Sequence, residues 1–191
     1  HYHWNYRPAS ATIRNVFRAY WSMSMVWGLM AGYSLEGGFE YDAVVLARPD
    51  VWFHVDTDLP RRTFPLPEQT VYLPSFESDQ GNGGRKNDRF AYGSVSAMRV
   101  MMHRLATLLD AEAGQYAGKI DSEWVVGHHL EMHNITVETL EFPVTRIRLT
   151  GDIPLFDHGR VKNACESGQD PMACEMVRLG FRVPLNGSSR G

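Results

Sequence analysis

The chain has no excess of positive charge and no long hydrophobic run, and each absence excludes a class of function. Its 19 Lys and Arg residues are outnumbered by 22 Asp and Glu residues, which gives a net charge of −3 and a pI near 6.2. A nucleic-acid-binding protein is normally basic, so we expect no nucleic-acid partner. The most apolar stretch, residues 23–31, is far shorter than a transmembrane helix, so we expect no membrane span in this chain.

Cysteine is also scarce, because the chain contains only Cys165 and Cys174, in a loop-like stretch. Two alternatives remain open for this pair: a disulfide that closes a short loop, or two free thiols. A disulfide would indicate an oxidising compartment. The chain also lacks an initiator Met and a signal peptide, so we expect its first residue to be a cut or processed end.

Two N-x-S/T sequons, at Asn134 and Asn186, are candidate glycosylation sites. In a chain of this composition chance alone would supply about one sequon, so the pair is weak support. Together the sequons and the cysteines favour the lumen of the secretory pathway.

What the chain does contain is enough apolar sequence for a core. With 191 residues, 43% of them hydrophobic, we expect a single domain over residues 1–191. Apolar residues at helical spacing predict helices over 10–33, over 94–114, and from Asp121 or Ser122 onward. Apolar runs and alternation predict strands over 41–47, 70–73, 89–92, 135–140 and 144–149. Helices interleaved with strands predict an α/β fold, or α+β with a mixed sheet.

Two stretches lack these patterns. Residues 75–88, SFESDQGNGGRKND, are rich in glycine and charge and predict a flexible surface loop. Such a loop is either a plain connection or a lid over a ligand. Residues 151–191 predict an irregular tail.

Histidine and serine give no clear catalytic motif. His129 and His133 are four residues apart and His128 is adjacent, which is one way to build a zinc site in a hydrolase. The H-E-x-x-H arrangement is missing, so we favour surface or partly buried histidines. Ser94 has no glycine two residues before it, which argues against a nucleophile elbow.

Arginine and aspartate at strand ends are the remaining candidates. In the stretch YDAVVLARPDVWF an apolar strand ends in Arg48-Pro49-Asp50. Such groups suit an anionic ligand such as a diphosphate, with or without a divalent cation. The alternative is that Arg48 forms an ion pair with Asp50 or with a helix carboxylate.

Four stretches in order, YDAVVLARPDVWF, NDRFAYGSVSAM, SEWVVGHHL and TRIRLTGD, resemble a group of glycosyltransferases of the GT-A type. The resemblance covers about residues 18–157. It implies a GT-A-like, nucleotide-diphospho-sugar transferase-like fold that transfers a sugar from a nucleotide-sugar donor to a glycan or other hydroxyl acceptor. It also implies a Golgi location.

The same resemblance assigns roles to residues at the donor. GT-A enzymes hold a divalent cation and the donor diphosphate with an Asp-x-Asp motif, and Arg48-Pro49-Asp50 takes its place here. Arg48 and Asp50 are therefore expected to bind the donor, with Asp50 as a ligand of Mn²⁺ or Mg²⁺. Because Arg replaces the first Asp, independence of metal is the alternative. Asp88 and Arg89 resemble the segment that borders the donor sugar, and an ordinary turn is the alternative there.

Asp121 and Glu123 resemble the acidic segment that faces the acceptor. The resemblance implies that Glu123 is the catalytic base, with Asp121 as the second candidate. The alternative is that both cap the following helix.

The resemblance fails at the start of the chain. GT-A enzymes place a nucleotide-binding βαβ half before this motif, and too few residues precede Arg48 to form one. We therefore expect a missing N-terminal half or a partner chain. The alternative function is a non-catalytic carbohydrate-binding or assembly module derived from a glycosyltransferase fold.

Overall fold

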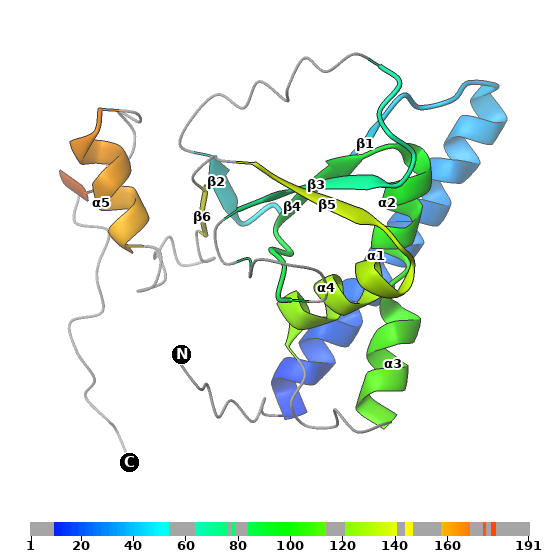
Figure 1. Ribbon diagram of the computed structural model, residues 1–191, viewed down its shortest axis with the longest axis horizontal. Helices are drawn as coiled ribbons and strands as arrows, with labels where there is room; N and C mark the ends of the chain where they lie inside the picture. Colours follow the sequence, from blue (N-terminus) through cyan, green and yellow to red (C-terminus); the bar gives the residue numbers. More distant parts are fainter. Residues whose placement is uncertain are drawn as a thin grey trace. The chain divides into compact units, whose positions relative to one another are not determined.

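The computed structural model describes residues 10–53, 64–75, 78, 84–113, 121–140, 144–146, 158–168, 174, 177 and 178 (Figure 1). The sequence led us to expect one domain, whereas the contacts gather the chain into two compact units. The first unit comprises residues 1–46 and 63–140, and the second comprises residues 47–62 and 141–191.

The first unit holds most of the regular structure. Its helices are α1 (Ser10–Gly37), α2 (Val95–Met102), α3 (Leu105–Ala113) and α4 (Ser122–Met132). Its strands are β1 (Val44–Ala47, which ends at the unit boundary), β3 (Thr70–Pro74), β4 (Phe90–Gly93) and β5 (Thr136–Leu140). The second unit holds β2 (Val51–Phe53), β6 (Val144–Arg146) and α5 (His158–Glu166).

The strands of the first unit form a mixed sheet in the order β1-β4-β3-β5. β3 runs antiparallel to β4, with Val71 opposite Gly93, and parallel to β5, with Thr70 opposite Thr136. In the second unit β2 and β6 form an antiparallel pair, with Val51 opposite Arg146. The expected mixture of helices with a mixed sheet is confirmed.

The core of the first unit lies between one face of this sheet and the helices. Val71 and Leu73 of β3 are fully buried, and alternation places both on the same face. They join a cluster to which α1, α2 and α4 contribute Trp27, Met98, Met101, Val126 and Leu130. α1 runs beside α2 and α3 (Figure 1). Burial of this apolar surface fixes where α4 meets the segment before β4.

The predicted helix over 94–114 is wrong in one respect, because α2 and α3 are separate helices. The break falls at His103 and Arg104, where the His103 N–H donates to the Val100 carbonyl. The buried Arg104 guanidinium donates to the Met101 carbonyl at 2.6 Å, so it satisfies a carbonyl that the helix end leaves free. The apolar spacing hides this break because the spacing continues across it, although α2 packs in one core cluster and Leu108 of α3 in another.

Other boundaries differ from the prediction as well. α1 continues to Gly37, and the apolar strand β1 lies at the edge of the sheet, with Val45 46% exposed. The expected irregular tail contains a regular helix, α5. Within the described residues, no helix combines the length and the apolar character needed to cross a membrane.

Candidate functional site

The segment before β4 lies directly against the N-terminal half of α4. The Lys86 N–H donates to the Glu123 carbonyl at 2.9 Å, which joins the two backbones. One turn further along α4, a Cβ on Gly127 would lie 1.8 Å from the carbonyl oxygen of Gly84. Only a glycine at position 127 therefore allows this approach.

The approach buries a run of polar side chains. Lys86, Asn87, Asp88 and Arg89 are each at most 7% exposed. Four consecutive polar residues are seldom buried together, because each loses its contacts with water. The expected surface loop over 75–88 is thus wrong for its last three residues, whereas residues 76, 77 and 79–83 lie outside the described residues.

Local hydrogen bonds give this segment its shape. The Asn87 side-chain oxygen accepts from the Arg89 N–H at 2.9 Å, and the Asn87 N–H donates to the Ser78 hydroxyl at 3.0 Å. These two bonds hold the chain in a tight turn at Asn87, which fixes the orientation of Asp88 and Arg89 directly before β4.

The first turn of α4 supplies the carboxylates. Asp121 is the N-cap, and its side chain accepts from the Trp124 N–H at 2.7 Å. Glu123 follows within the first turn, where a negative charge is favoured by the helix dipole. The Tyr20 hydroxyl of α1 donates to the Ser122 carbonyl at 2.9 Å, so a third element holds this turn in place.

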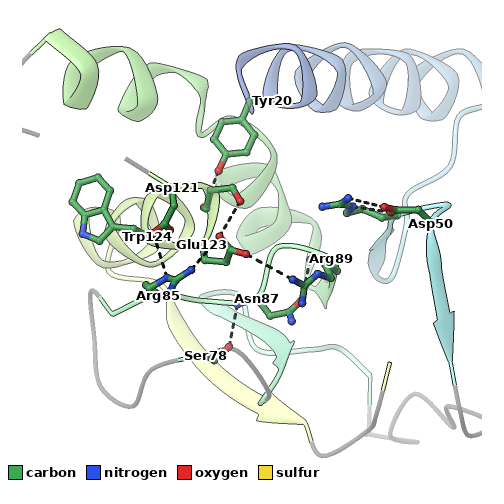
Figure 2. Close-up of polar contacts among 11 residues, drawn as sticks. Tyr20, Asp50, Ser78, Arg85, Asn87, Arg89, Asp121, Glu123 and Trp124 are labelled. Atoms are coloured by element: carbon green, nitrogen blue, oxygen red, sulfur yellow. Dashed lines mark hydrogen bonds and ion pairs between the residues drawn. The ribbon is translucent and has the colours of Figure 1, made fainter. Parts of the chain in front are cut away.

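The Glu123 carboxylate lies between two guanidinium groups (Figure 2). One oxygen is 3.6 Å from Arg85 Nη2, and the other is 3.8 Å from Arg89 Nη2. The Ser122 hydroxyl also donates to Glu123, at 3.1 Å. Arg85 reaches Asp121 as well, at 3.3 Å. The residues that bear on Glu123 thus come from α4 and from the segment that leads into β4.

Burial raises the pKa of Glu123 above its usual range. The neighbouring carboxylates of Asp88 and Asp121 raise this pKa further, whereas Arg85 opposes them. The Glu123 side chain keeps 16% of its surface exposed, so a small group can still reach it. A reachable carboxylate of raised pKa is the kind of group that accepts a proton during catalysis.

Tyr20 is held neutral beside this cluster. Burial raises the pKa of its phenol to about 12, although the charge of Arg104 acts in the opposite direction. The Arg104 guanidinium lies 4.2 Å from the centre of the Tyr20 ring. Tyr20 therefore acts as a neutral donor to the helix turn and not as an acid.

The Arg48-Pro49-Asp50 step forms a turn between β1 and β2, in which the Val51 N–H donates to the Arg48 carbonyl. Arg48 Nε and Nη2 donate to the two carboxylate oxygens of Asp50 at 2.9 and 2.8 Å (Figure 2). The alternative of an internal ion pair is therefore the arrangement seen. Both side chains keep about a third of their surface exposed, at 33% and 30%.

This pair does not fit a cation site as it stands. The guanidinium covers both oxygens that Asp50 would offer to Mn²⁺ or Mg²⁺. Within the described part of the chain no group of three or more His, Cys, Asp or Glu residues could hold a metal ion. Metal binding at Asp50 stays a prediction that requires this pair to open.

The three histidines have separate surroundings. His129 is buried, with its ring nitrogens 2.7 Å from the Thr107 hydroxyl and 2.8 Å from the Val100 carbonyl. Burial lowers the pKa of His129 to about 4, so its ring is neutral near pH 7. His128 stacks on Trp124, and the His133 ring bonds to the His129 carbonyl. These contacts suit a packing role.

The predicted cysteine and glycosylation sites have different outcomes. Cys165 and Cys174 form a disulfide, with Cα atoms 4.6 Å apart, so the first of the two alternatives is the one seen. Asn134 is exposed in the turn between α4 and β5 and has a φ of 54°, which asparagine tolerates well. Asn186 lies outside the described residues.

Sequence reasoning missed two members of the cluster. Arg85 belongs to a stretch predicted to be a flexible loop, and Tyr20 to apolar residues that predicted only a helix over 10–33. Tyr20 carried a usable signal, because a buried tyrosine needs a partner for its hydroxyl. Arg85 carried none, because its partners are 36 and 38 residues away in the chain.

Comparison with known proteins identifies no relative. No protein-family model matches the chain, and neither a curated protein nor a solved structure is significantly similar to it. The function is therefore argued from the geometry of the Glu123 cluster and from the resemblance of the four sequence stretches.

Proposed function

We propose that this chain is the later part of a glycosyltransferase that moves a sugar from a nucleotide-sugar donor to a hydroxyl acceptor. One observation carries the proposal: Glu123 is a partly buried carboxylate of raised pKa, held between Arg85 and Arg89 at a helix N-terminus. Glycosyl transfer calls for a base at the acceptor hydroxyl and for positive charge near the departing diphosphate, and this cluster offers a candidate for each.

In the proposed reaction Glu123 takes the proton from the acceptor hydroxyl. The acceptor oxygen then forms a bond to the anomeric carbon, while the bond from that carbon to the diphosphate breaks and its electron pair leaves with the nucleoside diphosphate. Arg89 and Arg85 lie nearest to Glu123 and supply positive charge toward the departing anion. Asp88 binds hydroxyls of the donor sugar. Asp121 is the weaker base candidate, because its carboxylate already caps α4.

Arg48 and Asp50 keep their proposed part in donor binding on one condition. Their bidentate ion pair has to open before Arg48 can bind a phosphate. A guanidinium released in this way can neutralise a diphosphate directly, without a metal, while the freed Asp50 carboxylate can hold Mn²⁺ or Mg²⁺. The comparison of Mn²⁺ with a chelator in the test below separates these two modes. The disulfide is compatible with the proposed secretory or Golgi lumen.

A second candidate is a non-catalytic carbohydrate-binding or assembly module. The closed Arg48–Asp50 pair favours it, because charges that satisfy one another are a stable resting arrangement without a ligand. In this case donors or glycans bind but no transfer occurs.

The test combines binding and transfer for a panel of nucleotide sugars, each measured with Mn²⁺ and with a chelator. Thermal stabilisation by a donor reports binding, and release of the nucleoside diphosphate reports turnover. We expect Glu123→Gln to lower turnover at least about 100-fold while donor stabilisation remains. Glu131→Gln, on the exposed side of the same helix, is the matched control and should leave turnover unchanged.

Each other outcome of this test has a clear meaning. Stabilisation without turnover in the native chain would support the module instead of the enzyme. Equal turnover of Glu123→Gln and the native chain would remove Glu123 as the base. Neither stabilisation nor turnover with any donor would contradict the enzyme for this chain alone and would leave the module only as a binder of glycans or of a protein partner.

A further inference from the structure

The outward face of α1 is apolar and open to solvent. Trp21 is 56% exposed, Met25 52% and Leu29 73%, and the three recur every four residues along one side of the helix. The inward side of the same helix buries Tyr20 and Trp27 in the core. A continuous apolar stripe of this kind marks a protein-interaction surface more often than plain solvent exposure.

The same face offers room for a close partner. Gly28 and Gly32 lie on it, and a Cβ added to either would meet no atom within 4 Å. Toward the N-terminal end an open hollow is lined by Phe17, Arg18, Trp21 and Ser22. The face therefore has an open hollow at one end, and toward the other end the side chain of Leu29 protrudes, with 73% of its surface exposed.

Charges of opposite sign flank this stripe. Arg14 and Arg18 lie on the outward face near the start of α1, and Glu36 lies on it near the end. Within the described residues none of these three side chains forms an ion pair. The face is thus positive at one end, apolar in the middle and negative at the other end.

We propose that α1 packs against α1 of a second copy of this chain, antiparallel and centred on Met25. The 28-residue helix is self-complementary in this register. Arg14 falls opposite Glu36 of the second copy, and Leu29 falls opposite Trp21. Leu29 of each copy then fills the hollow beside Trp21 of the other, and Ser22 faces Gly28, where the two backbones come close.

The charge pattern also discriminates against a membrane surface as the occupant. A helix that lies on anionic lipid carries Lys and Arg along the border of its apolar face. The outward face of α1 instead ends in Glu36, which anionic lipid would repel. An antiparallel copy turns this same asymmetry into two attractive pairs.

Cysteine cross-linking tests the register directly, because both native cysteines are already joined in a disulfide. Met25→Cys places one new thiol on the two-fold axis, where it meets its own copy. We expect most of this variant to become a covalent dimer under mild oxidation, seen on a non-reducing gel. Leu35→Cys is the control: this position is more exposed, at 85%, but lies away from the axis, so it should stay at least tenfold less cross-linked.

Charge reversal with sedimentation analysis supplies a second measurement. Arg14→Glu or Glu36→Arg alone should weaken dimer formation by roughly tenfold, since each breaks two symmetric pairs. The double variant Arg14→Glu with Glu36→Arg should return the dissociation constant to the native value. A monomeric native chain, binding of the native chain to anionic vesicles through this face, or equal cross-linking of Met25→Cys and Leu35→Cys would overturn the proposal.

Discussion

Two charged groups in this molecule look alike in sequence but differ in how they are built. The Arg48–Asp50 pair is closed within one turn of three residues, and both partners keep about a third of their side-chain surface exposed. The cluster around Glu123 joins α1, α4 and the segment before β4. Tyr20, Asp88 and Arg89 are buried in it, Glu123 keeps 16% of its side-chain surface exposed, and Arg85 and Asp121 lie at its open side. The first pair needs no tertiary structure, whereas the second exists only in the folded unit.

This difference indicates where function is to be sought. An exposed ion pair within one turn contributes little free energy and constrains little else. A cluster assembled from distant residues, in which Asp88 and Arg89 are buried and Glu123 is mostly buried, costs stability because these charges lose hydration, and it keeps Glu123 at a raised pKa. We therefore place the candidate chemistry at Glu123 and regard Arg48–Asp50 as a pair that a ligand would have to open.

The largest expected effect comes from breaking the approach that assembles the cluster. Gly127→Ala puts a Cβ 1.8 Å from the Gly84 carbonyl oxygen, so the segment before β4 must move off α4. We expect a loss of roughly 4 kcal/mol in unfolding free energy, together with loss of the ion pairs to Glu123. Urea unfolding measures the change.

A matched control is available for this substitution. Gly159→Ala in α5 adds a Cβ that meets no atom within 4 Å, so stability should stay within about 0.5 kcal/mol of the native value. An equal loss in both variants would mean that a helical glycine as such, and not the close approach, sets the stability.

The second effect concerns His129, which is buried in α4 beyond the cluster. Its pKa of about 4 lies below the unfolded value of 6.5, so the unfolded chain binds the proton more tightly. The contribution of neutral His129 to the free energy of unfolding is therefore complete above pH 6.5 and is lost as pH falls toward 4. The loss attributable to His129 should be about 3 kcal/mol.

Unfolding measured from pH 7.5 to pH 4 tests this contribution. The slope of stability against pH should flatten in His129→Gln, whose side chain does not titrate, and should persist in His103→Gln, which alters an exposed ring. An unchanged slope in His129→Gln would assign the acid sensitivity to another group.

The third effect has the opposite sign and concerns Glu123. Because its pKa is raised in the folded state, the folded chain holds the proton more tightly, and stability falls as pH rises above the usual glutamate value. We expect Glu123→Gln to be more stable than the native chain at pH 7, by roughly 1 kcal/mol, and equal to it near pH 4. Thermal unfolding of both proteins at the two pH values tests this expectation. A variant less stable than the native chain at pH 7 would mean that the ion pairs to Glu123 stabilise the fold by more than the burial of its charge costs.

The smallest effect should come from the exposed pair. Asp50→Asn removes the charge that Arg48 contacts, and we expect unfolding free energy to change by less than about 1 kcal/mol. Unfolding in low and high salt measures it, and any difference should shrink as salt screens the pair. A loss of several kcal/mol would show that this turn supports much more of the structure than its contacts indicate.

Much of the fold could be predicted because its signals are local. The cap at Asp121, the short apolar run of β3, the alternation in β5 and the helical spacing in α1 each depend on neighbouring residues. The break between α2 and α3 could not be predicted, since it depends on the buried guanidinium of Arg104, whose position is set by packing against α1.

The site was predictable only in part for the same reason. Asp88, Arg89, Asp121 and Glu123 could be named from the sequence, and the structure brings them into one cluster. Arg85 could not, because nothing local distinguishes it from the charged residues of a surface loop. The Arg48–Asp50 contact was foreseeable as an alternative, because a turn places those two side chains side by side.

The exposed turn at Asn134 has a consequence for aggregation. Within the described residues β5, which begins at Thr136, pairs only with β3 and is therefore an edge strand of the sheet. Asn134 lies two residues before the start of β5, so a carbohydrate attached to it would obstruct a strand of another molecule from pairing with this edge strand. Chain produced without glycosylation should therefore have the greater tendency to form intermolecular β-structure.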